Sequence, residues 1–383
     1  MERKIEKLKK IREELNAVFY ERDDVITGAL CALVSGSHLL LIGPPGTAKS
    51  LLANEICERI EGAEYFQWML TKFTTPEELF GAVSLKGLEN DEYRRVTLGK
   101  LPEAHVAFLD EVFKSSSSIL NTLLTIINER VFYNGTGKVN VPLISLFGAS
   151  NEIPIEEEEL EALYDRFLLR YVVDYIKEDF RFLKLLQGGP EVTEKTTLTF
   201  DELKACQEEA MAVEVSPQIY KLIARIRSEL SKKGLVASDR RYKQSVSILK
   251  SLAYIDGRSE VNEQDFSVLE NMLWRDPDEK LEIRTVIRQA LYGYRERSRE
   301  LLIQAREIED YANRQWDDEE MLVRANIEAQ TKLKSILSNF DALIDECRER
   351  QKSTSEVEDI RGQVESIQKG ILDKVLSGSG DMA

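Results

Sequence analysis

One short segment constrains this chain more than any other, namely Gly43-Pro44-Pro45-Gly46-Thr47-Ala48-Lys49-Ser50. It follows His38 and the apolar residues 39–42 and precedes a helical pattern of apolar residues over 50–60. A strand, a loop and a helix in this order are typical of a phosphate-binding loop, because backbone N–H groups and the helix N-terminus attract anionic phosphates. The alternative is an incidental Gly-Pro turn before a helix, which leaves the Lys-Ser pair unexplained.

The residue types of this loop suit a nucleotide and a magnesium ion. We predict that Lys49 reaches the β- and γ-phosphate oxygens and that the Ser50 hydroxyl is a ligand of Mg²⁺. Ala48 departs from the usual pattern, in which a glycine precedes the lysine, and we expect its single methyl group to fit. The other residues predicted to contact ATP or ADP are Gly43, Pro44, Pro45, Gly46, Thr47 and Leu51.

Two further apolar runs end in polar residues that suit phosphate chemistry. Residues 106–109 lead into Asp110 and Glu111, and residues 143–147 lead towards Asn151. Both runs are typical of buried parallel strands, whose carboxyl ends meet at one edge of a sheet. We predict that Asp110 holds Mg²⁺, that Glu111 polarises the attacking water and that Asn151 orients this water. Each residue taken alone also fits a solvated strand end or a turn.

Two arginine pairs are candidates for the cation that such a site needs beside Lys49. Arg166 and Arg170 lie near a predicted helix end, and Arg240 and Arg241 begin a later helix. We expect one guanidinium of the second pair to lie over the nucleotide. The angle between the two domains would then depend on whether the phosphates are bound. For either pair taken alone, an exposed or salt-bridged arginine is the commoner situation.

The chain divides into a mixed part and a helical part. Strand-like runs alternate with helices up to a Gly-Gly-Pro cluster that ends at Pro190, which favours a doubly wound α/β domain. Four helices are expected to begin near residues 201, 217, 238 and 262, and longer helices follow. We therefore predict an α/β nucleotide-binding core with a parallel sheet at 1–190, an α-helical lid at 191–276, a C-terminal helical bundle at 277–376 and a flexible tail at 377–383.

Composition narrows the class of protein further. The 52 basic and 68 acidic residues give a net charge of −16, which opposes general attraction to nucleic acids or anionic membranes. The four cysteines form no CxxC pair, and the longest apolar run is too short to span a bilayer. We expect a cytoplasmic protein with reduced thiols and no membrane insertion.

With GPPGTAKS, VAFLDE, SNE, LYDRF and SDRR in this order, residues 10–275 resemble the MoxR branch of the AAA+ ATPases. The stretches TKFTTPEELFG, NTLL and NER point to its regulatory ATPase variant A (RavA) subgroup, and an alanine at position 48 is normal for that branch. The resemblance implies an AAA+ core that hydrolyses ATP with Mg²⁺ in a hexameric ring. It also implies a chaperone-like remodeller of protein partners, with a von Willebrand factor A-domain protein as co-worker.

The resemblance also assigns residues on matching positions. Arg166 resembles the arginine finger that acts on the neighbouring subunit's nucleotide, with Arg170 as the alternate. Arg240 resembles the lid arginine, with Arg241 as the alternate. Residues 70–103 and the hairpin-like 131–139 resemble loops that this clade projects towards its pore, although they equally fit ordinary surface connections.

Two other classes of function stay open at this point. A nucleic-acid motor is disfavoured by the acidic charge, but the cations Lys86, Arg94, Arg95 and Lys138 near the loops keep it testable by DNA-stimulated hydrolysis. A nucleotide-gated assembly scaffold would need ATP binding only, so a Glu111→Gln variant would retain its function. The C-terminal helices show no strand-rich insert of the kind that longer subgroup members use to bind a partner, and no partner is carried over from them.

Overall fold

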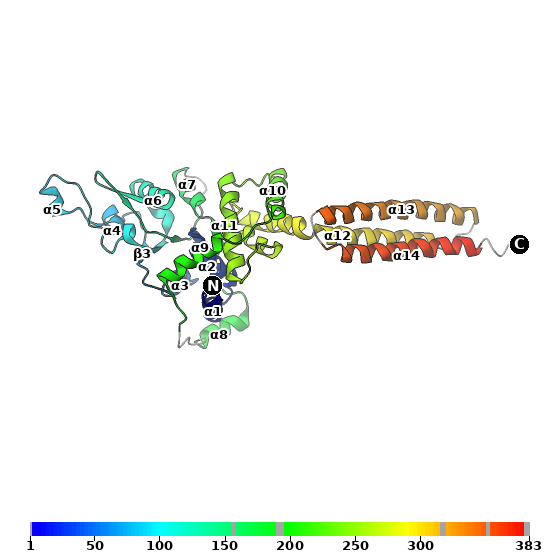
Figure 1. Cartoon of the computed structure of the whole chain (residues 1–383), viewed down its shortest axis with the longest axis horizontal. Coiled ribbons are helices and arrows are strands. Elements are labelled where there is room, and N and C mark those ends of the chain that lie inside the picture. Colours follow the sequence, from blue (N-terminus) through cyan, green and yellow to red (C-terminus); the bar gives the residue numbers. More distant parts are fainter. Residues whose placement is uncertain (1, 155–157, 189–194, 315–318, 350–352, 379–383) are drawn as a thin grey trace. The chain divides into compact units, whose positions relative to one another are not determined.

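The computed structural model describes residues 2–154, 158–188, 195–314, 319–349 and 353–378. They form two compact units, Met1–Arg284 and Thr285–Ala383 (Figure 1). The predicted boundary at residues 190 and 191 and the tail residues 379–383 lie outside the described residues. The division of the first unit into a core and a lid stays a prediction. No helix among the described residues combines the length and apolar character needed to cross a bilayer.

A parallel five-stranded sheet with the order β3-β4-β7-β1-β8 forms the centre of the first unit. Its strands are β1 (Leu39–Ile42), β3 (Tyr65–Met69), β4 (Val106–Asp110), β7 (Ser145–Ser150) and β8 (Leu169–Val172). β1 and β7 are buried along their whole length, which explains their continuous apolar sequences. The sequence identified β1, β4 and β7, but the strands β3 and β8 at the two edges of the sheet escaped it.

The register gathers three predicted strand ends at one edge of the sheet. Ile42 pairs with Ser150, and Leu109 pairs with Gly148. β7 therefore lies between β1 and β4, and the prediction that its end lies beside that of β4 is confirmed. As a result, Asn151 follows its strand between the phosphate loop and Asp110.

The helices α2 (Asp23–Ser35) and α3 (Lys49–Cys57) pack against strands of this sheet. The other helices of this part of the chain are α1 (Glu2–Val18), α6 (Ser117–Glu129), α7 (Glu158–Arg166) and α8 (Asp179–Leu186). α3 is shorter than the apolar pattern predicted, because Ile60 enters β2 (Ile60–Glu61), which pairs with β9 (Leu198–Thr199). α8 was not predicted.

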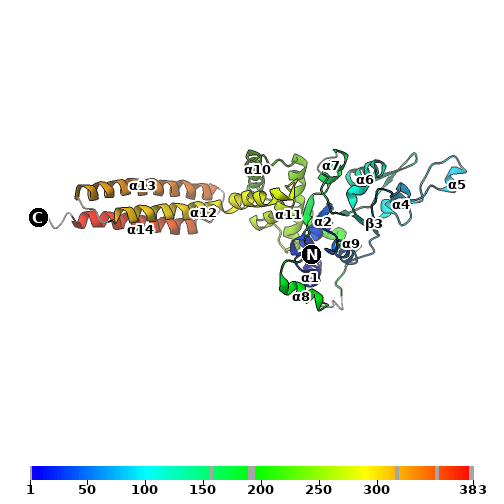
Figure 2. The same ribbon diagram turned by 180° about the vertical axis from the view of Figure 1, so that it is seen from behind.

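A projecting segment and a hairpin extend from the core. The segment contains α4 (Pro76–Phe80), α5 (Leu85–Leu88) and the 3₁₀ helix η1 (Leu101–Glu103), and α5 lies at its tip in both views (Figures 1 and 2). The predicted hairpin is confirmed as β5 (Val131–Asn134) and β6 (Gly137–Asn140). The Asn134 side chain accepts a hydrogen bond from the Arg95 N–H (2.6 Å) and donates one to the Arg95 carbonyl (3.0 Å), which joins the hairpin to the segment.

The helices after the core begin close to the predicted positions. They are α9 (Phe200–Met211), α10 (Pro217–Lys232), α11 (Asp239–Ile255) and the 3₁₀ helices η3 (Glu263–Asn271) and η4 (Pro277–Glu279). Asn262 caps η3 as predicted for the fourth helix, but this element is a 3₁₀ helix and not an α-helix. The helices α9 and α11 pack against α2, so they share one compact unit with the sheet.

Three helices make up the predicted C-terminal bundle. They are α12 (Lys280–Ala312), α13 (Glu319–Glu349) and α14 (Ser355–Gly378), and α12 begins within the first unit. Their shared core contains the fully buried Leu333, Phe340 and Val364. The predicted C-terminal helical region is therefore confirmed.

Candidate functional site

The phosphate loop lies where β1 ends and α3 begins, as predicted. The Gly43 N–H donates to the Ser150 carbonyl of the neighbouring strand (3.0 Å). A Cβ atom on Gly43 would lie 1.9 Å from the carbonyl oxygen of Val173, which follows β8. Only glycine therefore fits at the start of the loop. Gly46 has a φ of +79°, a conformation that glycine adopts without steric cost.

Ala48 takes a left-handed backbone conformation immediately before α3. Its φ of 62° and ψ of 25° cost an L-residue roughly 1 kcal/mol relative to glycine. Its methyl group is exposed, in keeping with the expectation that an alanine fits here. The loop thus holds a strained residue at the point where the α3 N-terminus opens.

The Lys49 side chain is buried within the loop. Its Nζ donates to the carbonyl oxygens of Gly43 (2.7 Å) and Pro44 (2.8 Å). Burial lowers the pKa of Lys49, and the nearby carboxylates of Asp110 and Glu111 oppose that shift. The ammonium group is thus held in the loop, on the side of the two carboxylates.

Ser50 and Asp110 approach each other across the sheet edge. The Ser50 Oγ donates to the Asp110 Oδ2 (3.3 Å). A hydroxyl and a carboxylate oxygen at this separation fit Mg²⁺, which takes few protein ligands and completes its shell with water and substrate phosphates. Among the described residues, no cluster of three acidic, histidine or cysteine side chains forms a metal cage.

Glu111 stands in a left-handed conformation (φ 54°) between β4 and the 3₁₀ helix η2 (Val112–Lys114). Its Oε1 accepts a hydrogen bond from the Asn151 amide (2.6 Å). Its Oε2 lies 3.2 Å from the Nζ of Lys114. Both carboxylate oxygens are therefore engaged by neighbouring side chains.

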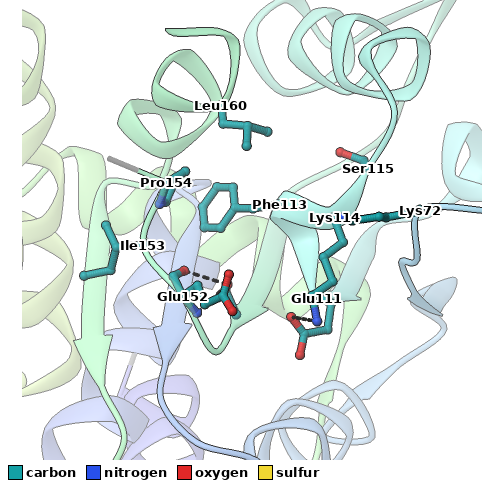
Figure 3. Close-up of a pocket in the computed structure, with 10 residues that line it drawn as sticks. Lys72, Glu111, Phe113, Lys114, Ser115, Glu152, Ile153, Pro154 and Leu160 are labelled. Carbon is teal, nitrogen blue, oxygen red and sulfur yellow. Dashed lines mark hydrogen bonds and ion pairs between the residues drawn. The ribbon is translucent and has the colours of Figure 1, made fainter. Parts of the chain in front are cut away.

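A pocket of about 690 Å³ opens beside this carboxylate. Figure 3 shows the Lys114 side chain reaching Glu111, with Phe113, Pro154 and Leu160 along the opposite side. The pocket joins the carboxyl edge of the sheet to the turn after β7. The Glu111 side chain therefore has an open, partly charged environment.

Arg166 and Arg240 lie together at the other edge of the sheet. They line a polar pocket of about 260 Å³ with His38, which precedes β1. Arg240 donates to the Asn128 Oδ1 at the end of α6 (3.4 Å). β1 separates these arginines from the phosphate loop by roughly 13 Å of strand. In this structure Arg240 lies away from the phosphate loop of its own chain, because α11 begins at the amino edge, and its contact with the nucleotide stays a prediction.

The two alternate arginines are buried inside the fold. Arg170 donates to the carbonyls of Trp274 and Tyr164. Burial lowers the pKa of Arg170 to about 9, with a further contribution from the neighbouring Arg241. Arg241 donates to the backbone carbonyl of Leu168 (2.8 Å) and to its neighbours. Both guanidiniums are thus engaged by backbone carbonyls within the fold, and the nucleotide contact of Arg241 stays a prediction.

Two residues near the site were missed by the sequence. Lys114 gave no signal, because a lysine in a short turn is ordinarily a solvated charge. The Tyr175 hydroxyl donates to the Pro45 carbonyl (3.3 Å) from the segment after β8. That contact depends on the pairing of β8 with β1, which the sequence did not indicate.

Comparisons with known proteins agree with this geometry. Residues 6–212 match the family model of the MoxR domain in the MoxR-vWA-beta-propeller ternary systems, and residues 218–287 match a AAA lid domain. An uncharacterized protein of Methanocaldococcus jannaschii is 48% identical over 282 residues, which cover 73% of each chain. Chaperone MoxR1 of Mycobacterium tuberculosis is 27% identical over 66% of this chain and 70% of its own.

A solved structure shares the fold. It is the crystal structure of a candidate ATPase from Cytophaga hutchinsonii, with a TM-score of 0.59 and 19% identity. The match covers 75% of this chain and 94% of that protein. At this identity the likeness concerns the fold alone.

Proposed function

Because the chain belongs to the MoxR family of AAA+ ATPases, we propose that it hydrolyses ATP to ADP and phosphate with Mg²⁺. Five residues gathered at one edge of the sheet support this proposal most directly: Lys49, Ser50, Asp110, Glu111 and Asn151. They supply a cation for the phosphates, two oxygen ligands, a proton acceptor and an amide. The finer assignment to the RavA subgroup stays a prediction.

In the proposed reaction, a water molecule attacks the γ-phosphorus in line with the bridging oxygen to the β-phosphate. Glu111 accepts the proton of this water as the new O–P bond forms, while the bond to the bridging oxygen breaks and ADP leaves. Asn151 positions the water, and Lys49 neutralises charge on the β- and γ-phosphates. Ser50 and Asp110 would hold Mg²⁺, which would supply positive charge to neutralise the phosphates.

The placement of the arginines supports a site shared between subunits. Arg166 and Arg240 lie at the amino edge of the sheet, and the phosphate loop lies at the carboxyl edge. In this structure neither of these guanidiniums therefore lies beside the phosphate loop of its own chain. We propose that they act on the nucleotide of the neighbouring subunit in a ring, which we take to be hexameric.

The partner of this ATPase is proposed to be a protein. The matching family model describes MoxR domains of systems that also contain vWA proteins, which supports a von Willebrand factor A-domain partner. One similar protein bears the name of a chaperone, which supports a chaperone-like role here. We propose that the core at 1–190 and the lid at 191–276 move relative to each other when the bound nucleotide changes. This movement would transmit the nucleotide state to the partner.

Steady-state ATP hydrolysis across protein concentrations tests the shared site. We expect Lys49→Ala, Glu111→Gln and Arg166→Ala each to lower turnover by at least a factor of about 10³, the usual range for such groups. Arg297→Ala is the matched control, because this exposed arginine lies in the second unit and pairs with Glu346. Assembly is followed in parallel by light scattering with each nucleotide.

Mixing two inactive variants separates a shared site from a private one. Arg166→Ala subunits retain an intact phosphate loop, and Glu111→Gln subunits retain an intact arginine. Mixed rings therefore contain complete sites at some interfaces, and we expect activity to return partly. Turnover that is independent of concentration and survives Arg166→Ala would contradict the shared site.

A further inference from the structure

The polar pocket at the amino edge of the sheet carries positive charge without negative charge. Its lining contains three arginines, Arg130, Arg166 and Arg240, and we call it the arginine pocket. None of the described residues that line it is acidic. The chain as a whole has 68 acidic and 52 basic residues, so the charge of the pocket is opposite in sign to that of the chain.

Three helix ends bring these arginines together. Arg130 follows α6, Arg166 is the last residue of α7, and Arg240 is the second residue of α11. The helices α6 and α7 pack side by side (Figure 1). All three arginines belong to the first unit, so the pocket lies within one compact body.

Two aspartates that could neutralise the pocket are paired elsewhere. Asp165 comes directly before the last residue of α7, but its carboxylate lies 3.2 Å from the guanidinium of Arg241. Asp239 is the first residue of α11, but its carboxylate lies 2.9 Å from the guanidinium of Arg227. The pocket therefore keeps its positive charge although acidic residues stand next to it in the sequence.

Arg166 and Arg240 have hydrogen-bond donors that the described part of the chain does not use. Neither of them forms an ion pair with a described residue. The Nε of Arg166 is buried and has no hydrogen-bond partner among the described residues. Arg240 is exposed and makes a long hydrogen bond to the Asn128 Oδ1 (3.4 Å). Because a buried donor without a partner is costly, Arg166 needs an acceptor from outside this part of the chain.

Arg130 has a different place in the pocket. Its guanidinium donates to the backbone carbonyls of Ile127 (2.5 Å), Gly36 (3.1 Å) and Ile144 (3.3 Å). Burial lowers the pKa of Arg130 to about 10, so the group stays charged at neutral pH. Arg130 is therefore a fixed positive charge in the wall, whereas Arg166 and Arg240 are able to donate to a ligand.

We propose that the arginine pocket binds a free tetrahedral oxyanion, either phosphate or sulfate, in the unassembled chain. A guanidinium is a planar fork of donors that matches two oxygens of such an anion, and it is more weakly hydrated than an ammonium group. Arg166 and Arg240 donate to the anion, and Arg130 adds its charge. The volume of about 260 Å³ suits a small anion, because pockets for organic ligands generally measure about 300–1,000 Å³.

A bound anion competes with the neighbouring subunit. This consequence rests on the proposed function, in which Arg166 and Arg240 contact the neighbour's nucleotide across the ring interface. Phosphate is itself a product of the proposed reaction, so accumulated product opposes ring formation. The binding of an anion to the unassembled chain does not depend on that function.

Titration of inorganic phosphate into the nucleotide-free chain tests the binding. Lys49→Ala is the reference protein, because the lysine of the phosphate loop also attracts phosphate. Calorimetric titrations are run at constant ionic strength in KCl. We expect one phosphate to bind per chain. Arg166→Gln or Arg240→Gln, added to the reference protein, should weaken binding at least tenfold, since each removes charged donors.

Two further variants and a thermal measurement separate binding from folding. Arg297→Gln is the matched control, because this exposed arginine pairs with Glu346 in the second unit. Arg240→Lys keeps the charge but loses the fork of donors, so its affinity should lie between those of the reference protein and Arg240→Gln. Phosphate should raise the thermal midpoint of the reference protein and of the Arg297→Gln control, but not that of the Arg166→Gln variant.

Ring formation by the wild type tests the competition. Assembly is followed by light scattering with Mg²⁺ and saturating ATP, in sulfate or in KCl of equal ionic strength. At a sulfate concentration equal to its dissociation constant, half of the pockets are occupied, so the protein concentration needed for assembly should rise about twofold. Added protein should reverse the effect, and added ATP should not, because the anion competes with a subunit and not with the nucleotide.

The outcomes distinguish the anion site from the proposed function. A reference protein that binds no phosphate, or that binds it equally well after Arg166→Gln and Arg240→Gln, would overturn the site and leave the ATPase proposal standing. Equal effects of sulfate and KCl on assembly would overturn the competition. A chain that binds phosphate through these arginines, but neither assembles nor hydrolyses ATP as the wild type, would overturn the proposed function and support the site.

Discussion

At the scale of single residues, the phosphate loop contains two positions where the backbone decides which side chain is tolerated. Gly43→Ala would place a Cβ 1.9 Å from the Val173 carbonyl, so we expect the loop to shift and ATP affinity to fall at least tenfold. Ala48→Gly would relieve a left-handed alanine and raise the free energy of unfolding by about 1 kcal/mol. Nucleotide titration and urea unfolding measure the two effects. If both variants changed ATP affinity and the free energy of unfolding by the same amounts, this account would be contradicted.

Lys114 holds one oxygen of the Glu111 carboxylate in this structure. Because the lysine is 45% exposed, such a pair contributes only about 0.2–1 kcal/mol. We expect Lys114→Met to free the carboxylate more often and to raise kcat for ATP by up to about fivefold, with KM unchanged. Lys114→Arg, which keeps the charge, should behave like the wild type. A fall in kcat would instead mean that Lys114 assists the reaction.

His38 makes the stability of the first unit depend on pH. Burial and the neighbouring Arg130 lower the pKa of His38 to about 3, from about 6.5 in the unfolded chain. Between these values the unfolded chain binds a proton that the folded chain does not bind, so folding stability falls as pH is lowered from about 6.5. We expect a slope of at most about 1.4 kcal/mol per pH unit in urea unfolding. His38→Gln should flatten that slope above pH 5, and an unaltered slope would argue against this origin.

At the scale of elements, α1 ties together parts of the chain that are distant in sequence. Glu14 on α1 accepts hydrogen bonds from Arg59 after α3 and from the Thr196 N–H (3.0 Å) before β9. Lys7 of the same helix pairs with Glu202 of α9 (2.7 Å). The charged face of this helix therefore connects the segment after α3, the segment before β9 and the helix α9.

Glu14 is the critical residue of this connection, since it pairs with Arg59, which is only 1% exposed. Glu14→Gln leaves the Arg59 charge buried without its counter-ion, so we expect the free energy of unfolding to fall by about 3 kcal/mol. The exposed neighbour Glu13 gives a matched control, and Glu13→Gln should change the free energy of unfolding by less than about 0.5 kcal/mol. Equal losses of this free energy in the two variants, measured by urea unfolding, would contradict the proposed role of Glu14.

At the scale of the whole molecule, the chain has two hydrophobic cores. The first unit and the second unit are separately compact, and Phe340 is fully buried in the second. We expect two calorimetric transitions. Phe340→Ala should cost about 3–5 kcal/mol and lower the midpoint of one transition only. Leu8→Ala, in the core of the first unit, should lower the other, and a single transition that both variants shift would contradict this division.

Several functional features follow from the sequence because they depend on neighbours along the chain. The apolar runs that lead into Asp110 and towards Asn151 predicted that both residues follow strand ends, and the sheet confirms that these two strands are neighbours. Capping residues such as Ser238 predicted helix starts within a residue. Local hydrogen bonding and hydrophobic periodicity suffice for such features.

Only the tertiary structure decided the rest. The sequence put Arg166 before its alternate Arg170 and Arg240 before its alternate Arg241 only by resemblance. The structure separates the members of each pair by burial, because Arg170 and Arg241 are the buried ones. Three further features likewise depend on packing between distant segments. They are the edge strands β3 and β8, the contact between Lys114 and Glu111, and the exposed apolar side chains of α8. The sequence by itself determined which chemical groups stand in the phosphate loop and at the ends of β4 and β7, because those positions depend on local backbone geometry. Which arginines face outwards was decided by the fold, because burial is set by all the elements packed around a side chain.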